Sequence, residues 1–258
     1  MKSSSSLKSL LGGLVLLAAP AALADSAANI ALFDSRMASA RTSTSPSGAT
    51  VTRTEMVNAL DAFAWDYWVD ATERAHLSTK VGNTTFLTGL ATDAKQYLNL
   101  FHELNDAAAY GDPLGMDAVS ATPAQLYGAS GPLASSSRIK EGSIAEGDGV
   151  ANQVTLTDTY FWAFGSYYDE PYFFEPVTEA GLRTRLQQRT YSGTPTAAEV
   201  DGAVAYLKQV SGTGQRLYIS SWRSMGRGGP GESAGFVVAA VSPDRLFVRM
   251  VEVLTWAE

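Results

Sequence analysis

The sequence predicts an α+β fold: an N-terminal helical hairpin followed by a mainly antiparallel sheet of about four strands, with two helices packed on one face. Two amphipathic segments between 51 and 106 predict the hairpin, because their apolar residues recur at helical spacing. Runs of β-branched and aromatic residues at 215–222, 235–241 and 245–256 predict the strands. The pattern leaves open whether the hairpin and the sheet share one core.

Residues 1–24 have the organisation of a secretory signal peptide. Two lysines lead into an apolar run at 10–17, and Ala22-Leu23-Ala24 forms an A-x-A cleavage site before Asp25. The apolar run is shorter than the roughly 20 residues that a spanning helix needs. We therefore expect an exported protein, periplasmic or secreted, without a membrane span.

Residues 25–50 include the Ser/Thr-rich run RTSTSPSGAT at 41–50 and show no sustained periodicity. Polar, proline-containing segments of this kind often lack enough apolar surface to fold against a core. The sequence therefore predicts a flexible leader at 25–50.

Residues 51–106 predict two long helices. Thr52 and Glu55 have the spacing of a capping box, and the apolar stripe that follows continues to about His76. Gly82-Asn83 interrupts the stripe before a second amphipathic segment begins. Because the connection is short, the two helices are expected to form an antiparallel hairpin.

Residues 107–150 are rich in glycine, serine and proline, as in GASGPLASSS, and have weak periodicity. Long irregular segments are uncommon inside compact domains. This composition predicts a connection at 107–150 that leads to an α+β sheet region at 151–258.

The densest aromatic stretch lies between Tyr160 and Phe174, which contain 9 of the chain's 26 aromatic residues. At 154–164, threonines alternate with apolar residues over much of the run, a pattern that predicts a two-faced strand. Asp158 falls on the apolar face of this strand, where burial would raise the pKa of its carboxyl.

The C-terminal third combines two helices with three strands. A helix is expected at 179–188, and Thr196 with Glu199 forms a second capping box at the start of another. The strands at 235–241 and 245–256 are separated by the turn residues Ser242-Pro243-Asp244.

The composition excludes several classes of function. The chain has no cysteine, so disulfides and thiolate metal sites cannot form. Its formal net charge of −7 argues against binding to nucleic acid, which recruits lysine and arginine. No cofactor-binding motif is present, and we expect no cofactor.

Two motifs suggest catalysis or metal binding. Gly231-Glu232-Ser233-Ala234-Gly235 fits the G-x-S-x-G nucleophile pattern, but a β-branched run follows it and no histidine occurs after His102. Glu73 and His76 have the helical spacing of carboxylate metal bundles, yet the further ligands of such a bundle are lacking. We therefore predict no metal site and no hydrolase of the G-x-S-x-G type.

The aromatic and acidic residues around 162–175 are the candidate ligand-binding surface. Aromatic rings beside carboxylates suit the recognition of sugars or cations. The candidate residues are Trp162, Tyr167, Tyr168, Asp169, Glu170 and Tyr172, with Trp222 and Arg223 expected next to them across the sheet.

The leading functional hypothesis is a soluble, non-catalytic binding or interaction protein whose ligand is a small molecule, a glycan or a protein. One alternative is a secreted, glycan-directed hydrolase that uses Asp158 with Asp169 or Glu170 as paired carboxylates. A weaker alternative is a structural envelope component that docks a partner through the hairpin.

Overall fold

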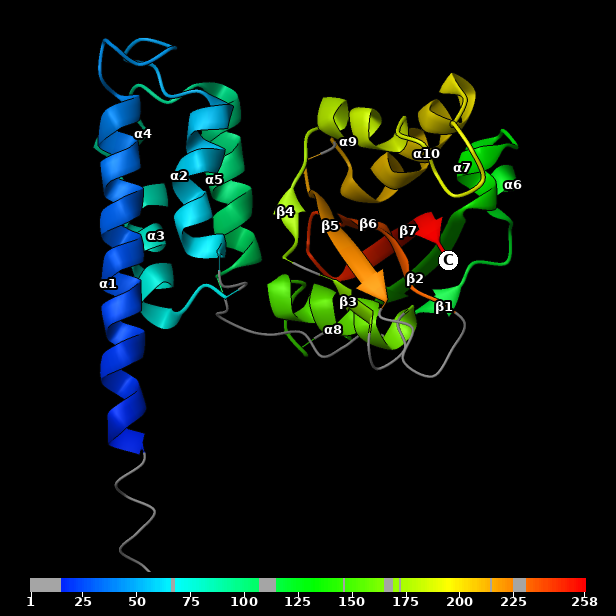
Figure 1. Cartoon of the computed structure of the whole chain (residues 1–258), viewed down its shortest axis with the longest axis horizontal. Helices are drawn as coiled ribbons and strands as arrows, with labels where there is room; N and C mark the ends of the chain where they lie inside the picture. Colours follow the sequence, from blue (N-terminus) through cyan, green and yellow to red (C-terminus); the bar gives the residue numbers. More distant parts are fainter. Residues whose placement is uncertain are drawn as a thin grey trace, which may run out of the picture. The chain divides into compact units, whose positions relative to one another are not determined.

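The computed structural model describes residues 15–65, 68–106, 115–145, 147–164, 169–171, 173–213, 215–224 and 231–258, with side chains from residue 25 onward except at 169–171. The chain divides into two compact units, Met1–His102 and Glu103–Glu258 (Figure 1). Helices and one antiparallel sheet are both present, so the predicted α+β class is confirmed. Among the residues so described, no helix is both long and apolar enough to cross a membrane.

The first unit is helical. Its elements are α1 (Val15–Ala40), α2 (Arg53–Ala64), α3 (Ala71–Val81), α4 (Thr84–Leu87) and most of α5 (Thr92–Leu104). Helix α1 packs against α2 and α3. The ring centroid of Phe33 on α1 lies 5.1 Å from that of Phe63 and 6.3 Å from that of Phe86, so aromatic contacts form the core of the unit.

The flexible leader predicted at 25–50 is wrong over its first part, because residues 25–40 belong to α1. Phe33 and Met37 lie one turn apart on this helix, and both are buried. The weak pattern at 25–40 thus concealed an apolar face that the other helices cover. Residues 41–50 form turns.

The predicted two-helix hairpin is also wrong, because the first long helix is divided into α2 and α3. The Oδ1 atom of Asp70 accepts hydrogen bonds from the backbone N–H groups of Thr72 (2.8 Å) and Glu73 (3.0 Å), which starts a new helix. The capping box of Thr52 and Glu55 is confirmed at the start of α2. The predicted interruption at Gly82-Asn83 is confirmed as well, since α3 ends at Val81.

The second unit is built on a seven-stranded antiparallel sheet, rather than on about four strands. The strands are β1 (Asp117–Ala118), β2 (Ser137–Ser143), β3 (Asp169–Pro171), β4 (Glu175–Pro176), β5 (Leu217–Ser224), β6 (Ser233–Val241) and β7 (Phe247–Ala257). Their order is β1-β2-β7-β6-β5-β3, and β4 also pairs with β5. The three predicted C-terminal strands are confirmed as β5, β6 and β7.

The connection predicted at 107–150 is largely folded where it is described. It contributes β1, β2, α6 (Pro123–Tyr127) and α7 (Pro132–Ser135). Strand β2 pairs with β7 along its whole length, so this segment is part of the sheet. Its only large apolar residue is Ile139, which explains why it did not resemble a strand in the sequence.

The strand predicted at 154–164 is a helix, α8 (Gln153–Ala163). The Oδ1 atom of Asn152 caps it by accepting from the N–H groups of Val154 (3.1 Å) and Thr155 (3.2 Å). The buried side chains are Thr155, Leu156, Thr159 and Tyr160, which follow a helical rather than an alternating period. Threonines fill much of the buried face, so the helix has no clear apolar stripe.

Helices cover both faces of the sheet, not one as predicted (Figure 1). The expected helices α9 (Glu179–Leu186) and α10 (Ala197–Ser211) are confirmed, and they share a buried cluster with Val251 and Val253 of β7. Helix α8 contacts Glu252 of the same strand. Because successive strand residues point to opposite faces, α8 lies on the face opposite α9 and α10.

Candidate binding surface on helix α8

Helix α8 is fixed to the sheet by a buried carboxylate. The Tyr160 hydroxyl donates a 2.9 Å hydrogen bond to Oε1 of Glu252, which is only 3% exposed. Arg138 on β2 donates to both carboxylate oxygens, at 2.8 Å from Nη2 to Oε1. The buried charge is therefore both paired and hydrogen-bonded, as its burial requires.

The C-terminal end of α8 is held by the same arginine. Nη2 of Arg138 donates to the backbone carbonyl of Phe164 at 3.1 Å. The Phe164 ring stacks on that of Tyr160 with centroids 5.6 Å apart, and the Arg138 guanidinium lies 5.6 Å from the Phe164 centroid. These contacts position the last turns of the helix.

Trp162 lies on the outer side of this helix and is 71% exposed. The neighbouring Phe161 ring meets it edge to face at 6.0 Å. Trp162 has the largest exposed fraction among the large hydrophobic residues that the structure describes as exposed. A predicted ligand-binding residue is thus accessible, on a helix that Tyr160 and Arg138 join to the sheet.

Asp158 precedes Trp162 by four residues, so the two side chains lie on one face of the helix. Its carboxyl is half-buried, and burial raises its pKa. Within the described part of the chain, Asp158 has no hydrogen-bond or ion-pair partner. The sequence predicted the direction of this shift, although it placed Asp158 on a strand.

Strand β3 brings Asp169 and Glu170 next to α8, since the two elements pack together. In the sheet, Asp169 pairs with Ser224 and Glu170 pairs with Arg223. Only the backbone of β3 is described. The remaining predicted residues, Tyr167, Tyr168 and Tyr172, lie outside the described residues.

Trp222 was predicted to bind ligand, but it is a core residue. It is 5% exposed, and a Cβ atom placed on Gly235 would lie 2.7 Å from its ring atom Cζ2. Its position explains why β6 carries a glycine there, since any side chain would displace the indole. Because successive strand residues point to opposite faces of the sheet, a shift of one residue along β5 would exchange a surface position for a core position.

Arg223 follows Trp222 and points away from the core. Its guanidinium pairs with the carboxylate of Glu232, and its side chain is 51% exposed. An exposed pair of this kind contributes about 0–1 kcal/mol to stability. Arg223 therefore remains a candidate contact, although it is already partnered.

The two motifs that suggested catalysis or metal binding have structural roles instead. Ser233 of the G-x-S-x-G run begins β6 and no helix follows it, so it does not form a nucleophile elbow. Glu73 completes the capping box of α3 and accepts a 2.8 Å hydrogen bond from Asn29, whereas Nε2 of His76 lies 3.3 Å from Asp34. Among the described residues, no group of three or more histidine or acidic side chains is arranged to hold a metal ion.

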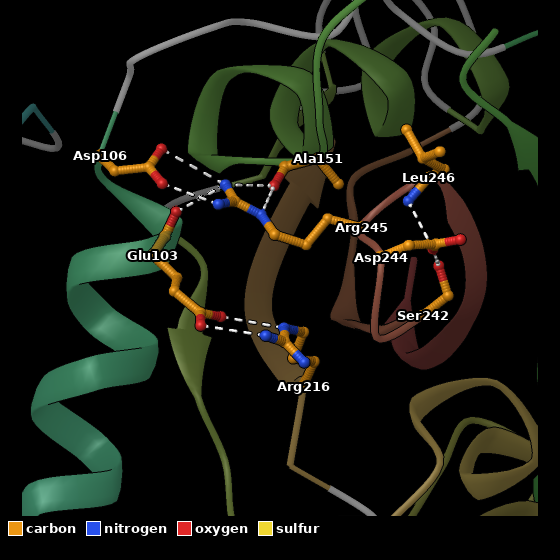
Figure 2. A network of polar contacts seen from close by, with 8 residues as sticks. All are labelled: Glu103, Asp106, Ala151, Arg216, Ser242, Asp244, Arg245 and Leu246. Atoms are coloured by element: carbon orange, nitrogen blue, oxygen red, sulfur yellow. Dashed lines mark hydrogen bonds and ion pairs between the residues drawn. The ribbon is translucent and has the colours of Figure 1, made fainter. Parts of the chain in front are cut away.

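The sequence did not reveal a second polar network, which surrounds the turn between β6 and β7 (Figure 2). Arg216 donates to both carboxylate oxygens of Glu103 at 2.9 and 3.0 Å. Arg245 donates to Asp106 at 2.7 Å and to the carbonyl of Ala151 at 2.8 Å. Its backbone φ of 65° is unusual for a residue other than glycine, and these bonds hold it in place. We assign this network to the stability of the sheet unit.

The comparisons with protein-family models, curated proteins and solved structures found no match. The arrangement on α8 is therefore interpreted from its own chemistry. It presents a flat apolar ring beside a carboxylate that has no partner among the described residues, on a helix fixed through Tyr160 and Glu252.

Proposed function

We propose that this protein is an exported, non-catalytic binding protein that holds a glycan or another hydroxyl-rich ligand on the α8 surface, defined as Asp158, Trp162 and the adjoining β3. Export to the periplasm or the medium is proposed from the signal-like residues 1–24. The observation that carries the proposal is the pair formed by Trp162 and Asp158 on one helix face.

Trp162 supplies the apolar part of such a site. Sugar rings have apolar C–H faces that can lie flat on an indole, and Trp162 is exposed enough to accept one. Single exposed hydrophobic residues are ordinary on protein surfaces. The polar neighbour and the rigid support distinguish this one.

Asp158 supplies the directional part. Its carboxylate has two oxygens that accept hydrogen bonds, and it has no partner among the described residues. A ligand with adjacent hydroxyl groups would supply donors to this half-buried carboxylate and offset the cost of its partial burial. Donors beside an apolar face are typical of carbohydrates.

The rigid support favours affinity. Binding to a preorganised surface avoids the entropy cost of ordering side chains, about 0.5–1.5 kcal/mol for each side chain that is immobilised. The bonds from Tyr160 and Arg138 to Glu252 supply that order beneath Trp162. The surface can therefore bind without a rearrangement of α8.

A glycan array tests this function. We expect the wild-type protein to bind a subset of glycans, and Trp162→Ala to weaken that binding by about tenfold or more, the equivalent of about 1.4 kcal/mol. Tyr191→Ala is the matched control, because Tyr191 is also exposed, at 58%, in the same unit. Equal loss in both variants, or no glycan bound by the wild-type protein, would contradict the proposal.

The second candidate is a glycan-directed hydrolase, favoured by the raised pKa of Asp158. A raised pKa is typical of a general acid, and Asp169 or Glu170 of β3 would be its partner. Hydrolysis of a bound glycan that disappears in Asp158→Asn, while binding persists, would select this function over simple binding.

A further inference from the structure

A polar depression of about 370 Å³ lies in the first unit, and none of its lining residues belongs to the α8 surface. It is formed by the C-terminal part of α1, the turns that follow and the start of α2. The lining residues that carry polar side chains are Ser35, Arg36, Ser39, Thr42, Thr44, Ser45, Glu55 and Asn58. Small-molecule pockets commonly begin at about 300 Å³, so this one can hold a ligand the size of a monosaccharide.

The walls of this depression are ordered by internal hydrogen bonds. The Thr42 hydroxyl donates to the carbonyl of Ser39 at 2.8 Å, and the Ser47 hydroxyl donates to Oε2 of Glu55 at 2.6 Å. The Ser45 hydroxyl bonds the carbonyl of Gly48, whose φ of 70° suits glycine. The Ser/Thr-rich run at 41–50 is thus folded and lines the depression, whereas its composition predicted a flexible leader.

Of the two charged residues of the lining, only Arg36 has an oppositely charged neighbour in the described part of the chain. Arg36 donates to the carbonyl of Asn58 at 2.5 Å and lies 3.7 Å from Asp61. Glu55 accepts from the backbone N–H of Thr52 at 2.9 Å, besides the bond from Ser47. Oε1 of Glu55 is buried and has no hydrogen-bond partner among the described residues, so a ligand that donates a hydrogen bond fits here and an anion does not.

The other groups that remain for a ligand are neutral hydroxyls. Among the described residues, the Ser35 and Ser39 hydroxyls have no hydrogen-bond partner, and the Thr44 hydroxyl bonds only that of Thr42, at 3.1 Å. Hydroxyl groups both donate and accept, so they match a ligand that does the same. An apolar ligand would leave these groups unpaired and is disfavoured.

From this geometry we propose that the depression between α1 and α2 is a binding site for a small neutral polyhydroxy compound of monosaccharide size. The site does not depend on the function proposed for α8, because none of its lining residues belongs to that unit. A variant that abolishes binding at one site therefore leaves binding at the other site testable.

The test is a titration of the ¹⁵N-labelled full chain with glucose, galactose and mannose at millimolar concentration, with inorganic phosphate as the anionic comparator. Backbone amide resonances of the lining residues report binding. We expect saturable shifts at 35–46 and at Asn58 with at least one sugar, and none with phosphate. The variant Ser39→Leu, which places an apolar side chain in the depression, should reduce the affinity by about tenfold.

Ala38→Leu is the matched control, because Ala38 is exposed on the same helix but does not line the depression. Its titration should equal that of the wild-type protein. Absence of shifts with all three sugars would overturn the proposal. So would equal effects of the two leucine variants, or a response to phosphate alone.

Discussion

The Tyr160 hydroxyl bonds Glu252 across 92 residues of sequence and joins α8 to the middle of the sheet. Glu252 is 3% exposed, and its neighbours along β7, Val251 and Val253, are buried apolar residues. Its second partner is Arg138, its neighbour in the β2–β7 register. These three residues support the surface on which Trp162 and Asp158 lie.

The Tyr160→Phe variant tests the bond to Glu252. The substitution removes one hydrogen bond to a charged group and keeps the ring that stacks on Phe164. We expect the free energy of unfolding to fall by about 1.5–3 kcal/mol, measured by urea denaturation. A change within the error of the wild-type value would show that the hydroxyl is not a partner of Glu252.

The Arg138→Met variant should be more damaging, because it leaves the buried Glu252 without its cation. Removing one member of a fully buried pair costs about 3–5 kcal/mol, and because the Arg138 side chain is 59% exposed we expect a loss at the lower end of that range. The double variant Arg138→Met, Glu252→Gln is the control, since it removes both charges and should recover much of the loss. If the single and double variants are equally stable in urea, the ion pair does not matter to the fold.

The Gly235→Ala variant tests the packing of Trp222. A Cβ atom at this position would lie 2.0 Å from the carbonyl oxygen of Val253 and 2.7 Å from the Trp222 ring. We expect a loss of about 1–3 kcal/mol in unfolding free energy, typical of overpacking. Gly115→Ala is the control, because its Cβ would meet nothing within 4 Å, and its midpoint in urea should be nearly unchanged.

The pH dependence of stability tests the environment of Asp158. Because burial raises its folded pKa above 3.8, Asp158 favours folding at low pH and loses that contribution as the pH rises through the folded value. The Asp158→Asn variant lacks this loss. Its stability relative to the wild-type protein should therefore increase between about pH 4 and pH 7, as measured by urea titrations.

The pKa of Asp244 is shifted in the opposite direction, so this residue serves as the control for that experiment. A hydrogen bond from Ser242 lowers its pKa below 3.8, and the N–H of Leu246 donates to it at 3.1 Å (Figure 2). Its contribution is present above pH 3.8 and is lost as the pH falls through the folded pKa. Asp244→Asn should thus lose stability relative to the wild-type protein at pH 7, and a shared trend for the two variants would contradict both assignments.

The helix starts and strands that the sequence predicted correctly are those determined by residues close together along the chain. The capping boxes at Thr52 and Thr196 place hydroxyl and carboxylate groups three residues apart, and this spacing alone starts a helix. Strands β5 to β7 were predictable because β-branched and aromatic residues recur along them between turn signals. In contrast, Asp70 and Glu73 were read as the interior of a helix, because apolar residues continue across the break.

Tertiary context decided what the sequence could not. Thr155 and Thr159 lie on the buried face of α8, so polar residues occupy the positions where a helix usually has its apolar stripe. Strand β2 offers only Ile139 to the core and depends on pairing with β7. Of the candidate site, the exposure of Trp162 agrees with the prediction, whereas Trp222 occupies the other face of its strand.

The most direct test of the α8 surface follows the indole N–H resonances of the chain's five tryptophans during titration with a glycan selected on the array. The account predicts that the Trp162 resonance shifts saturably, and that the buried Trp222 and the exposed Trp65, which lies in the other unit, do not. Saturable binding without a shift at Trp162, or with equal shifts at Trp65, would contradict the claim that the ligand binds on α8.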